Sequence, residues 1–251
     1  MLDIHSSNLF FYKMAREKIF RFKQFNVRNE LSAMKVGTDG VLLGSWADIS
    51  NAGSILDVGT GTGLIALMMA QRCNAEITAI EIDRDAAEEA RLNFDSSSWK
   101  GRLHLINADF LEYVGACISK YDAIVSNPPY FINSMNSPES KRNLARHTDT
   151  LSYNLLIAGA ARLLDKNGHL FLITPVDVEQ LIEECAKAEN MFLRQKLYVC
   201  PVVGGTPKRL LWDISKRNGD FEEKYIAIEK ERHVYTDEYI ELTHEYYINM
   251  P

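Results

Sequence analysis

Apolar and polar positions along the chain alternate between two periods, one typical of buried strands and one typical of amphipathic helices. Seven short apolar runs predict strands, at residues 54–58, 75–82, 102–108, 121–126, 170–174, 192–200 and 209–216. The segments between them have helical periodicity, at residues 63–73, 83–94, 109–117, 152–165 and 177–189. Strands that alternate with helices form parallel βαβ units. We therefore expect an α/β fold with a doubly wound, mostly parallel seven-stranded sheet that closes in a C-terminal antiparallel hairpin.

The two ends of the chain differ in pattern from this central part. We divide the sequence into an N-terminal extension, a β segment followed by a glycine-punctuated turn and a helix, the central α/β domain, and an acidic C-terminal tail, at residues 1–13, 14–50, 51–218 and 219–251. Within the tail, "TDEYIELTHEYY" predicts a helix whose Tyr239, Leu242 and Tyr246 pack on the body or on another subunit. The second alternative implies a homodimer.

Charge is distributed unevenly along the chain. The net charge of -6 argues against a protein that bulk electrostatics hold on nucleic acid. Six bases and one acid between Lys13 and Arg28 nevertheless give +5, whereas nine acids and three bases between Asp220 and Pro251 give -6. The basic run fits either a solvated strand face or an edge that contacts phosphate.

The composition is that of an ordinary globular protein, with 46% hydrophobic and 25% charged residues. No apolar run reaches the roughly 18–20 residues that cross a bilayer, and the start lacks a signal-peptide pattern. The cysteines have no paired spacing that predicts a metal site or a disulfide framework; they are Cys73, Cys117, Cys185 and Cys200. We therefore expect a cytoplasmic protein without a membrane partner or a metal.

The first predicted strand runs into "DVGTGTG", which places Asp57, Gly59, Gly61 and Gly63 at a strand-to-helix turn. Glycines at such a turn let backbone N–H groups approach a ligand, and the helix N-terminus adds partial positive charge. The strict dinucleotide motif G-x-G-x-x-G fails here, because the sixth position counted from Gly59 is Leu64. The glycines alone therefore leave both a nucleotide site and a structural turn open.

Acidic residues at three successive strand ends sharpen this prediction. Glu81 ends the second strand, where a carboxylate can accept both hydroxyls of a ribose. Asp109 follows the third strand, within reach of an adenine amino group, and Asp57 can lie near an ammonium group. Each acid alone also fits a helix N-cap or a solvated loop. Together they suit a nucleoside that carries a positively charged amino acid better than a dianionic pyrophosphate.

The fourth predicted strand ends in "VSNPPY", from Val125 to Tyr130. Two successive prolines end a strand, because neither has an N–H and each restricts the residue before it. They leave one amide, Asn127, and one ring, Tyr130, on a rigid arm. Without the glycine motif, a turn with a surface tyrosine would explain this stretch equally well.

The combination of "LDVGTGTGLIAL", Glu81, Asp109 and "NPPY" resembles the class I S-adenosylmethionine-dependent methyltransferases over residues 50–216. The resemblance implies a Rossmann-like fold with S-adenosyl-L-methionine as the methyl donor. It also implies cofactor contacts at Asp57, Gly59, Gly61, Gly63, Glu81 and Asp109.

In the members of this family that methylate amines, the resemblance gives the proline motif a catalytic role. The side-chain oxygen of Asn127 and the backbone carbonyl of Pro128 would accept hydrogen bonds from a planar NH2 group, while Tyr130 would stack on the target base. These acceptors favour a nitrogen whose lone pair points at the methyl group. They would therefore stabilise the transition state more than the ground state.

Further blocks narrow the resemblance. "FKQFNV", "MKVGTDGVLLGSWA", "LARHTDT" and "PKRLLWDISK" are similar to the bacterial tRNA adenine-N6 methyltransferases, which modify the adenosine beside the anticodon of a valine tRNA. By this resemblance the partner is tRNA, and Thr38 and Asp39 lie near the methionine end of the cofactor. The alternative is a Gly-Thr-Asp-Gly turn in which Asp39 caps the next helix. The resemblance also suggests RNA contacts for four residues, which as an alternative are ordinary surface residues: Arg146, His147, Lys208 and Arg209.

Two other functions are compatible with the sequence. The same NPPY chemistry acts on a ribosomal RNA base, on DNA or on a protein glutamine. The glutamine enzymes usually carry a sizeable helical N-terminal domain, and the short stretch before the "TDG" block makes that substrate the less favoured expectation. A non-catalytic RNA-binding scaffold of the same fold is the other alternative. Replacing Asn127 discriminates, because a scaffold would lose nothing.

Overall fold

The centre of the computed structural model, which describes residues 19–32, 35–129 and 151–250, is a nine-stranded sheet with the order β11-β10-β8-β9-β7-β6-β3-β4-β5. Its strands are β3 (Ser54–Val58), β4 (Glu76–Glu81), β5 (Leu103–Asn107), β6 (Tyr121–Ser126), β7 (Leu164–Pro175), β8 (Phe192–Val202), β9 (Arg209–Ser215), β10 (Glu222–Glu231) and β11 (Val234–Tyr235). The seven predicted strands are β3 to β9. They form the expected mostly parallel sheet, in which β9 runs antiparallel between β7 and β8.

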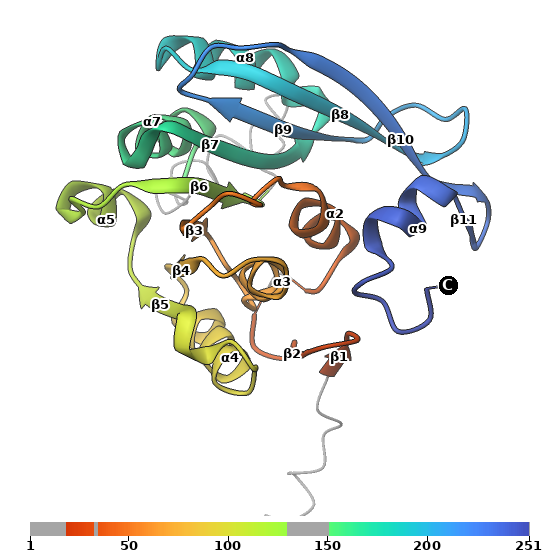
Figure 1. Ribbon diagram of the computed structural model, residues 1–251, viewed down its shortest axis with the longest axis horizontal. Helices are drawn as coiled ribbons and strands as arrows, with labels where there is room; N and C mark the ends of the chain where they lie inside the picture. Colours follow the sequence, from red (N-terminus) through yellow and green to blue (C-terminus); the bar gives the residue numbers. More distant parts are fainter. Residues whose placement is uncertain (1–18, 33–34, 130–150, 251) are drawn as a thin grey trace, which may run out of the picture.

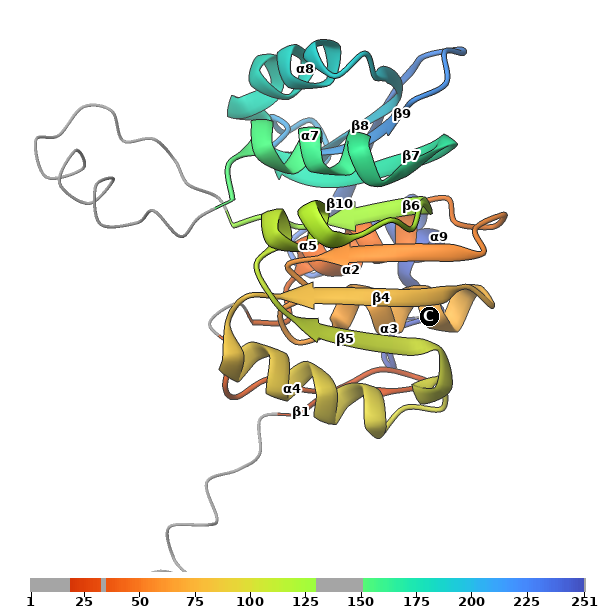
Figure 2. The same ribbon diagram turned by 90° about the vertical axis from the view of Figure 1, so that its left-hand side faces the viewer.

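The strand order reverses direction at β3. This strand pairs in parallel with β4 on one side and with β6 on the other. Successive crossovers therefore leave β3 toward opposite edges of the sheet, and the carboxyl ends of β3 and β6 lie side by side (Figure 2). In open α/β sheets, ligands bind in the crevice at such a switch point.

Helices cover both faces of the sheet (Figure 1). On one face lie α5 (Phe110–Ala116), α7 (Tyr153–Leu163) and α8 (Glu179–Ala188), and on the other lie α2 (Thr38–Trp46), α3 (Leu64–Arg72) and α9 (Asp237–Thr243). The helix α4 (Arg84–Asp95) packs beside β5, and short 3-10 turns occupy Lys100–Arg102 and Val176–Val178. Two separate clusters of buried side chains fill the two interfaces between sheet and helices.

The predicted N-terminal β segment is a hairpin of β1 (Ile19–Arg21) and β2 (Asn26–Arg28) outside the main sheet. Phe22, Phe25 and Val27 of this segment are buried. Phe20 remains partly exposed, and its ring lies 4.8 Å from the ring of Phe22. The basic residues of this segment that the structure describes are on an exposed hairpin rather than in the sheet.

The acidic C-terminal segment is part of the folded body. Its "EEKYIAIEKE" forms β10, which pairs in parallel with β8, so the sheet has two strands beyond the predicted seven. A strand near the sheet edge tolerates charge, and Ile226 is the one residue of this strand that is buried. The helix α9 packs on the chain itself, because Tyr239 and Tyr246 are buried and the Tyr246 hydroxyl donates to the Met68 carbonyl at 3.2 Å.

Within the described ranges, no helix has the length and hydropathy needed to cross a membrane. The same residues contain no group of three His, Cys, Asp or Glu side chains that would hold a metal ion. All four cysteines are free thiols.

Candidate functional site

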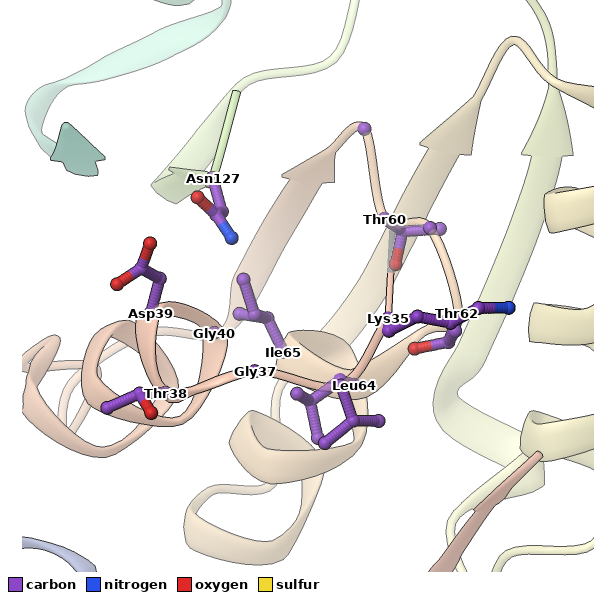
Figure 3. A pocket seen from close by; sticks show the side chains of 13 residues that line it. Lys35, Gly37, Thr38, Asp39, Gly40, Thr60, Thr62, Leu64, Ile65 and Asn127 are labelled. Atoms are coloured by element: carbon purple, nitrogen blue, oxygen red, sulfur yellow. The ribbon is translucent and has the colours of Figure 1, made fainter. Parts of the chain in front are cut away.

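A cavity of about 330 Å³ opens at the carboxyl ends of β3 and β6. Its walls are residues 35–40, the glycine loop at 59–62, two apolar side chains of α3 and Asn127 (Figure 3). The size falls in the range typical of small-molecule sites. The cavity therefore joins the glycine motif and the amide of "NPPY", which are more than 60 residues apart in the sequence.

The glycine loop has a backbone that other residues rarely adopt. Gly59, Gly61 and Gly63 have φ values of 71°, 56° and 81°. Gly59 lines the cavity, and a Cβ added there would meet no protein atom within 4 Å, so that carbon would occupy ligand space. A Cβ on Gly63 would instead lie 2.5 Å from the Phe94 ring, which makes this third glycine a packing requirement.

Asp57 lies beneath this loop and is completely buried. Its Oδ2 accepts a hydrogen bond from the Thr60 hydroxyl at 2.6 Å, and within the described structure its Oδ1 has no hydrogen-bond partner. Burial raises the pKa of Asp57 to about 7 despite the bond from Thr60. Asp57 is not part of the cavity wall, but Thr60 is, so the acid supports the loop from behind.

Glu81 ends β4 and holds the glycine loop from the side. Its Oε2 accepts from the Gly61 N–H at 2.8 Å and its Oε1 from the Asp83 N–H at 2.9 Å. A carboxylate has about four acceptor positions, so these two bonds leave it able to accept two hydroxyls. Ribose binding by Glu81 stays a prediction.

Asp109 is the N-cap of α5. Its Oδ1 accepts from the backbone N–H groups of Leu111 and Glu112 at 2.7 and 3.0 Å. The N-cap role that the sequence left open is therefore present in the structure. Contact of the same carboxyl with adenine stays a prediction.

Asn127 and Pro128 directly follow β6, where the Ser126 hydroxyl donates to the Val58 carbonyl at 2.8 Å and ties the two strand ends together. Asn127 lines the cavity and Pro128 is buried. The side chains of Asn127 and Asp39 reach from different elements toward the same space (Figure 3). Tyr130, Arg146 and His147 lie outside the described residues.

Thr38 and Asp39 are the first two residues of α2 and both line the cavity. The N-cap is Gly37, so Asp39 does not cap this helix. Its Oδ2 accepts instead from Arg209 Nε at 2.8 Å. Of the other expected contact residues, Arg209 thus lies against the cavity wall, and Lys208 beside it is exposed.

Sequence reasoning missed a second support of the cavity, which comes from α4. Both oxygens of the buried Glu89 accept backbone N–H groups, with Glu30 and Leu31 on Oε1 and Ser32 on Oε2. Asn93, one turn further, bonds both the N–H and the carbonyl of Arg28 and also the Thr62 carbonyl. The signal in the sequence is that this acid and this amide share the helix face of the buried alanines.

Lys35 is the other residue of the cavity wall that the sequence reasoning missed. Its hydrogen bonds exclude the interpretation that its ammonium group is available to bind a ligand. Its ammonium group donates to the carbonyls of Asn29, Glu30 and Ser32 at 3.2, 3.0 and 2.7 Å. Because an ammonium has three donors, these bonds use all of them. Lys35 therefore shapes the cavity wall by holding the segment before it.

Comparison with known proteins gives one consistent result. The family model of the methyltransferase small domain matches residues 32–200. A protein of Bacteroides fragilis named tRNA1(Val) (adenine(37)-N6)-methyltransferase is 45% identical over 235 residues, which are 93% of this chain and 99% of that protein. A protein of the same name from Bacteroides thetaiotaomicron is 46% identical over 233 residues, or 92% and 98% of the two chains.

A solved structure described as a predicted O-methyltransferase of Agrobacterium tumefaciens shares the fold, with a TM-score of 0.65 and 20% identity over 83% of this chain and 96% of that one. The chain belongs to the methyltransferase small domain family and, within it, to the family of the tRNA1(Val) (adenine(37)-N6)-methyltransferases.

Proposed function

We propose that this chain methylates the exocyclic N6 amine of an adenosine in the anticodon loop of a tRNA. Its family makes the chain an S-adenosylmethionine-dependent methyltransferase. One observation carries the choice of an amine: Asn127 lines the same cavity as the glycine loop, directly before the buried Pro128. The relatives with 45% identity carry the choice of tRNA adenine, since their names state that substrate.

The residues at the cavity fit S-adenosylmethionine. Gly59 leaves open space where a side chain would lie, and Glu81 fixes the backbone of Gly61. In our proposal the glycine loop, Glu81 and Asp109 hold the nucleoside, while Thr38 and Asp39 hold the methionine end with Asp57 behind the loop. When bound, the cofactor supplies a methyl group on a positively charged sulfur.

The chain's own part in the reaction is to orient the amine. The two N–H groups of the amine donate hydrogen bonds to Asn127 Oδ1 and to the Pro128 carbonyl, so that the nitrogen lone pair points into the cavity. Because the prolines fix both acceptors before the reaction, little alignment entropy is lost at that step. Tyr130 stacks on the adenine, a contact worth roughly 1–3 kcal/mol.

An anticodon-loop adenine is unpaired or easily displaced, so moving it into a pocket costs less than flipping a duplex base. We assign the phosphate contacts to Arg146, His147 and Lys208, together with the basic hairpin of β1 and β2. A tRNA substrate also favours a cytoplasmic location. Tyr239 and Tyr246 pack on their own chain, so they give no reason to expect a homodimer. Light scattering measures whether the protein is a monomer or a homodimer.

Methyl transfer to defined RNA tests the proposal. The protein is incubated with labelled S-adenosylmethionine and an unmodified valine tRNA transcript, beside a matched transcript with guanosine in place of the adenosine next to the anticodon. We expect N6-methyladenosine in the first RNA and no label in the second. Label in ribosomal RNA, DNA or protein with both tRNAs blank would contradict the tRNA assignment, and no transfer to any pool would favour the scaffold alternative.

A further inference from the structure

An ion pair joins Asp39, which lines the cavity, to Arg209, which is 170 residues away in the sequence. Arg209 is the first residue of β9, opposite Pro175 at the end of β7. Its Nε donates to Oδ2 of Asp39 at 2.8 Å. Since Asp39 is in the first turn of α2 and lines the cavity, this bond connects the wall of the cavity to the sheet.

The guanidinium of Arg209 is bonded at two of its nitrogens. Besides the bond from Nε to Asp39, its Nη1 donates to the Lys208 carbonyl at 3.0 Å, which fixes the planar group against its own chain segment. Its side chain is 33% exposed and that of Asp39 is 24% exposed, so solvent screens the pair only in part.

We propose that Arg209 is a positioning residue for the methyl donor, which acts through Asp39 instead of contacting the RNA. This inference rests on the proposed cofactor site. The bond to Nε fixes the plane of the Asp39 carboxylate, and a carboxylate, with about four acceptor positions, can receive more than one donor. Without Arg209, the Asp39 side chain gains rotamers and binding a cation must restrict them again.

Lys208 provides the matched comparison. It is the neighbouring cation on the same hairpin and it is exposed, whereas Arg209 is partly buried and bonds Asp39 of the cavity wall. If both cations contacted RNA, removing either would weaken tRNA binding. In our proposal the two variants separate: the change at Arg209 weakens cofactor binding, and the change at Lys208 weakens tRNA binding.

Calorimetric titration of S-adenosylmethionine in the absence of RNA tests this separation. We expect Arg209→Gln to weaken cofactor binding about tenfold, within the range of coupled neighbours, and Lys208→Gln to leave it unchanged. In an Asp39→Asn background, Arg209→Gln should have less than about a twofold further effect, because its route of action is then gone. Filter binding of tRNA should show the reverse order for the two single variants.

Further variants keep the test interpretable. Arg209→Lys retains the charge but not the planar fork, so it should lose less cofactor affinity than Arg209→Gln, at an unchanged melting temperature. Wild-type cofactor affinity in Arg209→Gln, or an equal loss with and without Asp39, would overturn the inference alone. Failure of the wild-type protein to bind S-adenosylmethionine would instead overturn the proposed cofactor site.

Discussion

Carboxylates do different work at the two ends of the central sheet. At the β3–β5 end, Glu81 accepts a hydrogen bond from the backbone of the glycine loop that lines the cavity, and Glu89 accepts one from Ser32, in the segment that precedes the lining residues 35–40. At the β8–β10 end, Glu179 and Glu183 of α8 bind the ammonium of Lys196 on β8, with Glu179 at 2.7 Å. Lys196 is 4% exposed and also lies 5.3 Å from the centre of the Trp212 ring.

The carboxylates at the first end therefore fix the shape of the cavity, and those at the second end hold a helix on the sheet. A carboxylate that binds backbone N–H groups fixes the path of a loop, and at this end the loops form a ligand site. A carboxylate that binds a lysine joins a helix to a strand. Substitutions at the first end should therefore change ligand binding, whereas substitutions at the second should change stability alone.

The largest effect is expected between the two ends, at the amide. Asn127→Ala should lower the rate of methyl transfer by roughly 10²–10³-fold, as the loss of one preorganised polar group does at other sites. Cofactor affinity should stay within about twofold of wild type, because the amide acts on the amine. Single-turnover kinetics and calorimetry measure the two quantities, and an unchanged rate would contradict catalysis by this motif.

Asp57, at the cavity end, predicts a fall in stability with rising pH. Burial raises its pKa from 3.8 to about 7, so between these values the unfolded chain releases a proton that the folded chain retains. This group therefore lowers the free energy of unfolding as pH rises through that window, by at most roughly 4 kcal/mol. Above pH 7 its contribution is constant.

The check is urea unfolding of the wild type and of Asp57→Asn between pH 4 and 8. The stability of the variant relative to the wild type should rise with pH and level off near neutrality. A difference that is constant over this range would show that Asp57 does not titrate as its burial requires.

Lys196→Met tests the opposite end. The variant keeps the apolar stem and removes the charge, which leaves Glu179 and Glu183 without their shared partner. Removing one partner of a fully buried ion pair costs about 3–5 kcal/mol. Both glutamates are about one-third exposed or more, so we expect a loss of about 2 kcal/mol in unfolding free energy. Calorimetry should find unchanged cofactor affinity. Weaker cofactor binding without a loss of stability would contradict the purely structural role of Lys196.

Glu89→Gln should have the smallest effect. It tests directly whether a carboxylate that binds backbone N–H groups affects cofactor binding as well as stability. One of its oxygens becomes an NH2 group, which places a donor against a backbone N–H. We expect a loss of about 1–2 kcal/mol in stability together with weaker cofactor binding. Glu88→Gln on the exposed face of α4 is the matched control. Equal behaviour of the two variants would show that Glu89 does not shape the cavity.

The alternation of strands and helices, the glycine turn and the amide could be predicted because each is a local pattern. "SILDV" is a short, mostly apolar run that leads into the glycine turn, and Asn127 and Pro128 follow the neighbouring strand, so the glycine turn and the amide lie at the carboxyl edge as predicted. β10 could not be predicted in the same way. Its sequence is dominated by Glu and Lys, which do not indicate a strand. It is a strand because its backbone pairs with β8.

The supports of the cavity escaped the sequence for a different reason. Glu89 bonds residues almost 60 positions away, and Arg209 bonds Asp39 across most of the chain. The apolar face of α4 indicates that Glu89 is turned inward, but it does not indicate which backbone groups the fold brings against this acid. Asp109 differs from these residues, because its position in the sequence predicts its role as the N-cap of α5. The predicted contact with a ligand is compatible with that role.

A crystal structure of the protein with S-adenosylmethionine bound tests the central claim most directly. The account predicts the nucleoside beside the glycine loop and Glu81, the methionine end at Thr38 and Asp39, and the methyl carbon facing the space in front of Asn127. A cofactor bound with its methyl carbon turned away from Asn127, or outside this cavity, would contradict it.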